Sequence, residues 1–293
     1  MDAILTILNA IFVAFVVSTM FHVGLTTTIE HLAGVVRNVW LMVGALVASL
    51  VAVPLLGWGI AEVFSLDAAA YVALVLVACS PGAPFSVALN GIAKGRLVAG
   101  AALMSILAVI GSVTTPITFE LIITSTDLAG AGGGEINTLE LVRTILLLQF
   151  LPIALGMATR GWKPSRADAW EPTADRVSSV TFGLVALAVV VGGFQEVVDL
   201  IGSWLLPAAV VFTVAAVLAG ALLSPGPRVL RNTAGIVASS RNASPVLVIA
   251  GIVFDDLEGV IPAIIAVYVM QLSAQLLIAM WLGREDEAVP VEA

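Results

Sequence analysis

The sequence predicts an all-α, polytopic membrane protein with nine transmembrane helices, and three observations support this fold class. Hydrophobic residues make up 60% of the 293 residues, whereas charged residues make up only 11%. Soluble domains contain about 25% charged residues, so we expect most of this chain to lie in lipid. The mean hydropathy of +1.11 agrees with that expectation. Apolar runs of about 20 residues, the length that a membrane helix needs, recur along the sequence.

Nine apolar runs are long enough to cross a bilayer. They occupy residues 4–25, 36–63, 69–93, 97–124, 139–159, 177–197, 202–223, 229–253 and 259–283. The links between them are short, and the longest are the glycine-rich stretch 125–138 and the polar stretch 160–176. We therefore expect a single transmembrane domain over residues 1–293, with no soluble module and with a short cytoplasmic tail at 284–293.

The distribution of lysine and arginine predicts the orientation. If the N-terminus lies outside, ten of the twelve basic residues fall on the inner side. These ten are Arg37, Lys94, Arg96, Arg160, Lys163, Arg166, Arg176, Arg228, Arg231 and Arg284. The opposite links carry acidic residues instead, among them Asp67 and Glu258. The positive-inside rule then predicts a cytoplasmic C-terminus and a location in the cell inner (plasma) membrane.

Composition also excludes several other kinds of site. The chain has no basic face, so nucleic acid is not an expected partner. A single cysteine, Cys79, excludes an internal disulfide and a thiolate metal cluster. Neither His22 nor His31 has a neighbour at metal-ligand spacing, so no metal site is expected from these residues. No pair of side chains forms a nucleophile and its base, so we do not expect an enzyme.

Two of the predicted spans are interrupted by polar, helix-breaking segments. The third contains "CSPGAP", where Pro81 and Pro84 remove helical donors and Gly82 relaxes the backbone. The eighth contains "SSRNASP", which ends with Ser244 and Pro245. Broken helices inside a bilayer require protein or water around the break, and a matched pair is the best sequence indicator of a transporter site. The alternative is that the prolines only kink ordinary helices.

The positions of the two breaks predict an internal repeat. Each broken span is next to last in its half of the sequence, so inverted repeats of about 4–124 and 139–283 would explain the order. These would be repeats of five spans in which the first span of the first half is missing, which gives four spans followed by five.

Four segments carry a resemblance to the bile acid:sodium symporter family, including its bacterial members. "MFHVGLTTTIEHL" resembles that family's M-F-x-M-G-L-T segment, and "CSPGAPFSVALNGIAKG" resembles its first crossover. "SSRNASPVLVIAG" is similar to the second crossover, E-x-G-x-Q-N-S, and "MQLSAQLLIAMW" is similar to the last helix. The resemblance implies a panel bundle and a core bundle, two crossed discontinuous helices, alternating access, and organic anions moved by sodium.

The same comparison shows where this chain departs from the family's sodium ligands. At the first site Ser86 matches the family's serine and remains a candidate sodium ligand, but its partners do not match. The other positions of that site hold Val87, Gly100 and Met104. At the second site Val237 and Arg241 stand where the family has Glu and Gln. These residues offer little side-chain oxygen and add a positive charge, so we expect sodium coupling to be lost although the resemblance implies it.

Arg241 is the most costly residue of the sequence. A charge at the centre of a membrane helix costs roughly 2.5–3.5 kcal/mol on insertion scales and usually has a specific partner. No Asp or Glu lies at a comparable depth, because Glu120 and Glu140 are nearer helix ends. Arg241 either bonds to free carbonyls of the opposite broken helix, in place of sodium, or faces an anionic substrate, for which its fork is well suited. The two roles are compatible.

Other polar residues complete the candidate substrate site. Asn242 matches the family's crossover asparagine, and Gln271 matches a position on the last helix. The further candidates are Ser86, Asn90, Ser240 and His22. Each of them has a structural alternative, because polar side chains also join membrane helices through hydrogen bonds. His22 has a further alternative as a proton-coupling group.

These observations predict a secondary active transporter of a small organic anion that works by alternating access without sodium. Its coupling would be to protons, to a counter-anion, or absent. A sodium-coupled symporter that retains an altered site is one alternative. A channel-like or sensory membrane protein on the same scaffold is another. A channel would need a polar stripe across the whole membrane, whereas the polar residues here cluster at mid-depth, and a sensor would need an appended signalling module.

Overall fold

The computed structural model describes residues 2–28, 38–126, 143, 146–192, 198, 200–254 and 257–285, and these residues are almost entirely helical. The α-helices are α1 (Asp2–Thr26), α3 (Val39–Val47), α4 (Val53–Val63), α5 (Ala68–Ala78), α6 (Ser86–Ile92), α7 (Leu97–Ile123), α9 (Leu151–Trp162), α10 (Pro164–Gly192), α12 (Leu205–Leu223), α13 (Arg228–Ser239), α14 (Ala243–Val253) and α15 (Val260–Glu285). Two short π-helices, η1 (Ala48–Ala52) and η2 (Leu146–Phe150), precede α4 and α9.

Several of these helices have the length and composition of membrane spans. In the described part of the chain, four stretches are long and apolar enough: Val39–Val63, Leu97–Ile123, Leu205–Leu223 and Val260–Arg284. Each has large apolar side chains on its outer face, such as Leu121 at 72% exposure and Leu277 at 68%. Helices that are apolar all round are typical of proteins surrounded by lipid. The shorter apolar helices include α5 and α14, which end or begin at the predicted breaks.

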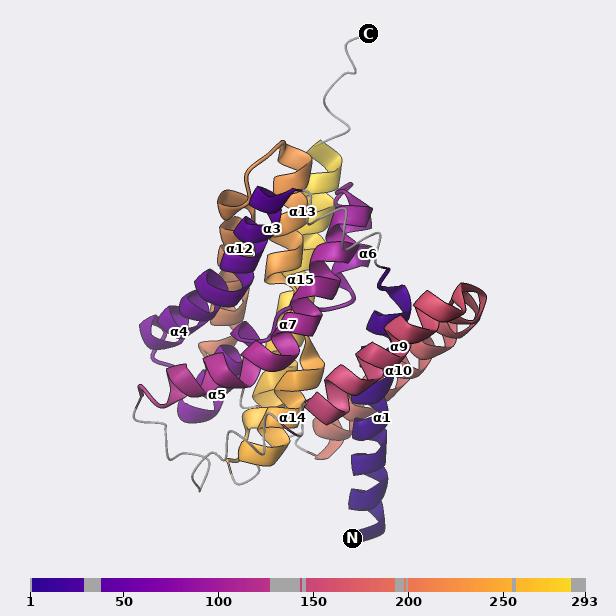
Figure 1. Cartoon of the computed structure of the whole chain (residues 1–293). Coiled ribbons are helices and arrows are strands. Elements are labelled where there is room, and N and C mark those ends of the chain that lie inside the picture. Colours follow the sequence, from indigo (N-terminus) through magenta and orange to yellow (C-terminus); the bar gives the residue numbers. More distant parts are fainter. Residues whose placement is uncertain are drawn as a thin grey trace.

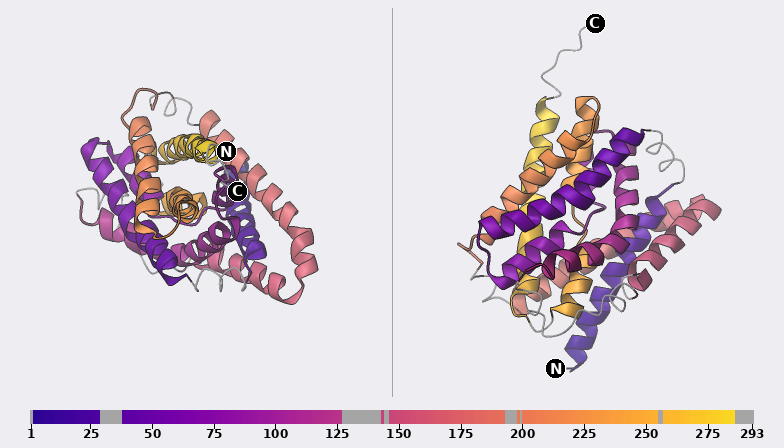
Figure 2. Two further views of the ribbon diagram at one scale, coloured as in Figure 1. Left: turned by 90° about the horizontal axis from the view of Figure 1, so that it is seen from above. Right: turned by 60° about the vertical axis from the view of Figure 1, so that its left-hand side comes forward.

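The helices form two groups. Helix α1 packs against α9 and α10, which lie on the opposite side of the molecule from α4 and α12 (Figures 1 and 2). A close glycine contact joins the first group, since a Cβ at Gly24 would lie 2.9 Å from the Cα of Gly156. In the second group a Cβ at Gly220 would lie 2.8 Å from the Cα of Gly235, where α12 meets α13. Small residues allow membrane helices to approach this closely.

The prediction of a polar link at 160–176 is wrong, because these residues are helical. Helix α9 continues to Trp162, and α10 starts at Pro164, so that only Lys163 separates the two helices. The carbonyl of Lys163 accepts the first hydrogen bonds of α10. Pro164 costs no hydrogen bond, because an N–H at the first helical position has no partner within the helix. Arg160 of α9 then forms salt bridges to Asp168 and Glu171 of α10, at 2.5 and 3.1 Å.

Some predicted features lie outside the described residues. These are most of the link 125–138, the start of the span predicted at 139–159, the end of the span predicted at 177–197, His31, and the tail from residue 286.

Each π-helix stands before a proline at the same spacing. Pro54 follows the start of η1 by six residues, and Pro152 follows the start of η2 by six. A proline has no N–H to donate to the preceding turn, and a π-turn is one way in which a helix adjusts around the missing bond. The adjustment in η1 has a direct effect on the site described next.

Candidate functional site

The two interrupted spans cross each other at their breaks. The helices are interrupted between α5 and α6 and between α13 and α14, and there Pro81 and Arg241 pair as an isolated antiparallel bridge. The N–H of Asn242 donates to the carbonyl of Ser80 at 2.8 Å, and the Ser80 hydroxyl donates to the carbonyl of Asn242 at 2.7 Å. The second break covers residues 240–242. Pro245 therefore lies in the first turn of α14, where its missing N–H has no helical partner to lose.

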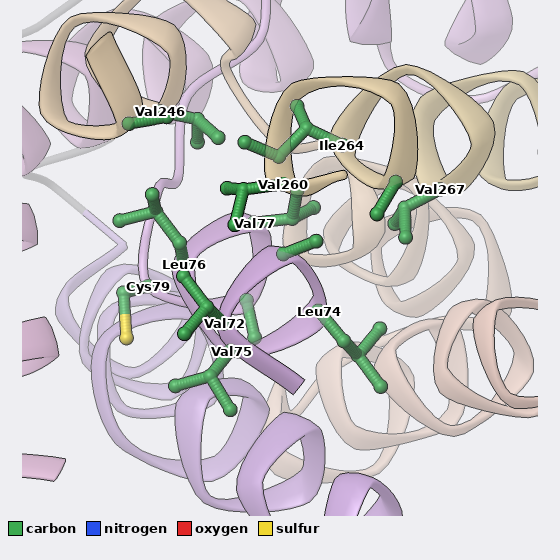
Figure 3. Close-up of a cluster of buried hydrophobic side chains, with 14 of the residues drawn as sticks. Val72, Leu74, Val75, Leu76, Val77, Cys79, Val246, Val260, Ile264 and Val267 are labelled. Atoms are coloured by element: carbon green, nitrogen blue, oxygen red, sulfur yellow. The ribbon is translucent and has the colours of Figure 1, made fainter. Parts of the chain in front are cut away.

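The first break depends on Gly82. Its φ of +90° is a conformation that glycine adopts at little cost. A Cβ at this position would lie 2.3 Å from the backbone N of Ala108 on α7, so the break rests directly on that helix. Helix α5, which leads into the break, is buried on all sides. Figure 3 shows Leu76 and Val77 of α5 in a cluster with Val246 of α14 and Val260 of α15.

Arg241 is fully buried and bonds to the backbone of three segments. Its Nη1 donates to the carbonyl of Ser49 in η1 at 3.1 Å and to the carbonyl of Ala78 at the end of α5 at 3.1 Å. Its Nη2 donates to the carbonyl of Ala238 near the end of α13. The guanidinium therefore holds together both broken spans and the span formed by α3, η1 and α4.

Each of these three carbonyls has lost its usual helical donor. The N–H of Val53 donates to the carbonyl of Ala48 in the π-turn instead of to the carbonyl of Ser49. The next residue, Pro54, has no N–H to donate to Ser49. Helix α5 ends at Ala78, and nothing continues it. The N–H of Asn242, which would bond to Ala238 in a continuous helix, donates to Ser80 across the crossing. The sequence therefore creates three free carbonyls, and Arg241 accounts for all of them.

The charge of Arg241 is balanced by backbone dipoles. Among the described residues no carboxylate forms an ion pair with it. Helices α5 and α13 both end at the guanidinium, and a helix C-terminus carries about half a negative charge. The Nε atom of Arg241 is buried and has no hydrogen-bond partner.

Two amides on α15 support the second break. Gln271 Nε2 donates to the carbonyl of Ser239 at 2.9 Å. Gln275 Nε2 donates to the hydroxyls of Ser239 at 2.7 Å and Ser240 at 3.2 Å. Both glutamines are fully buried. Gln275 was not among the residues predicted for the site, although its place four residues after Gln271 on one helix face was a usable signal.

Ser86 and Asn90 lie on α6, and their contacts differ from those of Arg241. Ser86 begins the helix, and its buried hydroxyl has no partner. Asn90 Nδ2 donates to the carbonyl of Ser86 at 3.0 Å, while its Oδ1 is buried without a partner. Asn90 also contacts the start of α7, because a Cβ at Gly100 would lie 3.0 Å from its Nδ2.

The remaining candidates lie on α14 and α1. Asn242 caps α14 by accepting the N–H of Ser244 at 3.0 Å. The Ser244 hydroxyl is buried without a partner, as is Nδ1 of His22 on α1.

The positions that replace the family's sodium ligands are packed with hydrocarbon. Met104 belongs to an apolar cluster with Val23 and Ala108, and Val87 packs against that cluster. Val237 is buried in a second cluster with residues of α3 and α7. No group of three potential acidic, cysteine or histidine ligands occurs in the part of the chain that the structure describes.

Comparison with known proteins identifies the family. A family profile described as "Sodium Bile acid symporter family" matches residues 13–201. The chain is 26% identical over 275 residues to a protein of Oryza sativa subsp. japonica named "Probable sodium/metabolite cotransporter BASS2, chloroplastic", and this match covers 90% of the chain but 62% of the rice protein. It is also 30% identical over 102 residues to the "Uncharacterized sodium-dependent transporter YocS" of Bacillus subtilis (strain 168), covering 35% of the chain and 32% of that protein.

The chain thus spans less than two thirds of the length of either relative. The family profile nevertheless covers more than half of the chain and includes the first crossover. The family resemblance predicted from the sequence motifs is confirmed. The chain is a multi-pass membrane protein that belongs to the sodium bile acid symporter family, a family of transporters rather than enzymes.

Proposed function

We propose that this protein is a secondary active transporter of a small organic anion, and that Arg241 takes the place of a coupling sodium ion. The observation that carries the proposal is the guanidinium at the crossing point, bonded to carbonyls of η1, α5 and α13. Unwound backbone carbonyls and the C-terminal ends of half-helices are the groups that coordinate sodium in transporters with broken helices. A covalently attached cation occupies these groups permanently, so no ion has to bind to them.

The side chains present do not fit a sodium ion at either family position. Val87 and Met104 lie in or against an apolar cluster and supply no oxygen. Val237 is also packed among apolar side chains and supplies no side-chain oxygen. The hydroxyl of Ser86 remains, but a lone hydroxyl does not replace a set of several oxygen ligands. This lack of ligands supports transport that does not depend on sodium.

The proposed mechanism is alternating access between two rigid groups. Nine spans, arranged as inverted repeats over about 4–124 and 139–283, would form a panel of α1, α9 and α10 and a core of the remaining helices. Tight glycine contacts within each group support rigid-body movement. The distribution of basic residues supports an N-terminus outside the cell and a C-terminus in the cytoplasm of an inner-membrane protein.

An organic anion would bind beside the crossing. The Nη atoms of Arg241 already donate to carbonyls. Arg241 would therefore contribute to anion binding through its fixed positive charge nearby. The N-terminal end of α14, with the unpartnered Ser244 hydroxyl and Asn242, would offer donors to a carboxylate, sulfonate or phosphate. Ser86, Asn90, Ser240, Gln271 and His22 remain candidates for contacts with the rest of the substrate.

A second candidate function is sodium-coupled symport through an altered site. The names of the two relatives, a sodium/metabolite cotransporter and a sodium-dependent transporter, favour it. The two candidates differ in one measurable quantity, the effect of a sodium gradient on the uptake rate.

Uptake into proteoliposomes tests the transport proposal. The probes are labelled mono- and dicarboxylates, sulfonates and phosphate esters. We expect saturable uptake of one anion class, with competition inside that class, and a raised KM in Ser244→Ala. The matched control is Ser273→Ala, since Ser273 is an exposed serine of α15 that bonds only within its helix. A flux that rises linearly with concentration would indicate a channel and contradict the proposal.

A further inference from the structure

A groove lies between α12, α13 and α15, near the end of α13 that is away from the crossing. It encloses about 400 Å³. One wall is formed by Val214 and Leu218 of α12, and the other by Ile278 and Trp281 of α15. Leu218 and Trp281 are more than half exposed, so the groove opens at the outer surface of the helix group. Its walls are apolar and run along the helices, which suits a hydrocarbon chain.

One end of the groove is basic. Arg228, Arg231 and Asn232 line it from the start of α13. The Nε of Arg231 donates to the carbonyl of Ala221 on α12 at 3.0 Å, which fixes this guanidinium at the mouth of the groove. Among the residues that the structure describes, those that line the groove include no acidic side chain. The N-terminus of α13, a helix of 12 residues, adds its positive dipole. This end of the groove is therefore complementary to an anion.

The basic end coincides with the end of the membrane-spanning helices. Helix α12 finishes at Leu223 and α13 starts at Arg228, in a turn at the same end of the molecule as the C-terminal end of α15 (Figure 1). Trp281 lies close to the end of α15, where a tryptophan marks the interface between lipid and water. The basic residues of the sequence predict that this end faces the cytoplasm, whose leaflet is rich in anionic lipid.

We propose that this groove binds an anionic phospholipid. The acyl chain lies between α12 and α15, and the phosphate is held by Arg228, Arg231 and the start of α13. Basic pockets between transmembrane helices on the cytoplasmic side are a known means of binding anionic headgroups. Helix α13 leads directly to Arg241, so the bound lipid would steady the half-helix that carries the second crossing.

Native mass spectrometry of the full chain in detergent tests this proposal without a transport assay. The probes are phosphatidylglycerol, phosphatidylcholine with the same acyl chains, and inorganic phosphate. We expect phosphatidylglycerol to stay bound and the other two to dissociate. The double variant Arg228→Gln/Arg231→Gln should lower the affinity for phosphatidylglycerol about 10- to 30-fold, from the contribution of two basic side chains. Arg176→Gln removes an exposed arginine of α10 and should leave affinity unchanged.

A second variant separates loss of the site from loss of the fold. Leu218→Trp fills the groove with an apolar group at an exposed position and leaves both arginines in place. We expect it to weaken phosphatidylglycerol binding as well. Equal retention of phosphatidylcholine, binding of inorganic phosphate alone, or unchanged binding in Leu218→Trp would overturn the proposal.

Discussion

Arg241 Nη1 lies 3.1 Å from the carbonyl oxygen of Ser49, 192 positions earlier in the sequence. The contact exists because the π-turn shifts the N–H of Val53 to Ala48 and because Pro54 has no N–H. A helix irregularity in one span and a buried charge in another therefore form one structural unit. Without the irregularity the charge would lose an acceptor, and without the charge the carbonyl would be buried and unsatisfied.

The first prediction concerns the stability supplied by Arg241. Arg241→Gln removes a buried cation from three carbonyls and should lower the free energy of unfolding by about 3–5 kcal/mol, because each buried acceptor left without a donor costs about 1–3 kcal/mol. Arg241→Lys keeps the charge but lacks the planar fork, so its loss should be smaller. The single cysteine, Cys79, is buried, so a thiol-reactive dye reports unfolding in detergent directly. Arg176→Gln is the control, and an equal loss in that variant would refute the assignment.

The second prediction tests the link between Pro54 and Arg241. Pro54→Ala supplies the N–H that the π-turn lacks and allows the helix to satisfy the carbonyl of Ser49 itself. A double-mutant cycle with Arg241→Gln, measured by unfolding in SDS mixed micelles, should give a coupling energy of about 0.5–3 kcal/mol. Pro152→Ala is a matched control, because Pro152 follows η2 at the same spacing. If the changes in stability caused by Pro54→Ala and by Pro152→Ala were both additive with that caused by Arg241→Gln, η1 and Arg241 would be independent.

The third prediction concerns the geometry of the first break. Gly82→Ala forces a side chain into a left-handed conformation and against the backbone of Ala108. We expect it to cost more than about 2 kcal/mol and to abolish uptake. Gly59→Ala is the comparison, because a Cβ there meets open space, and it should be neutral or stabilise the helix by roughly 0.5–1 kcal/mol. Wild-type stability in Gly82→Ala would show that the break tolerates other backbone paths.

The fourth prediction concerns Gln275, the buried amide on α15 that was not predicted from the sequence. Gln275→Leu removes the donor to the Ser239 and Ser240 hydroxyls and should cost about 1–2 kcal/mol. In a Ser239→Ala/Ser240→Ala background the same change should cost much less, because its partners are already absent. Unfolding in SDS mixed micelles measures both values. The same cost in both backgrounds would assign the effect to packing instead of hydrogen bonding.

The sequence was sufficient to predict the helical membrane fold and both breaks, for identifiable reasons. The deficit of charge and the length of the apolar runs indicate membrane helices, and Pro81 with Gly82 cannot continue one. The partners of Arg241 were harder to predict. Carbonyls free of helical bonds leave no side-chain signature, so their identity as Ser49, Ala78 and Ala238 required the structure. Pro54 was visible in the sequence, but its effect is exerted on a carbonyl five residues earlier.

The error at 160–176 has a different cause. Its polar composition indicated a link, but polar residues also form helices where their charges pair. Arg160 with Asp168 and Glu171 does so between α9 and α10. The structure shows most of these side chains at the surface of the molecule, but local composition predicted their secondary structure incorrectly.

If Arg241 replaces a coupling sodium ion, the uptake rate should not depend on sodium. Initial rates are measured in proteoliposomes with an inward sodium gradient and with sodium replaced by choline. The comparison protein is the double variant Val237→Glu/Arg241→Gln, which restores the residue types of the family's second sodium site. We expect equal rates for the wild type in the two media and sodium-stimulated uptake only in the double variant. A wild-type protein that takes up its anion only with the sodium gradient would contradict it.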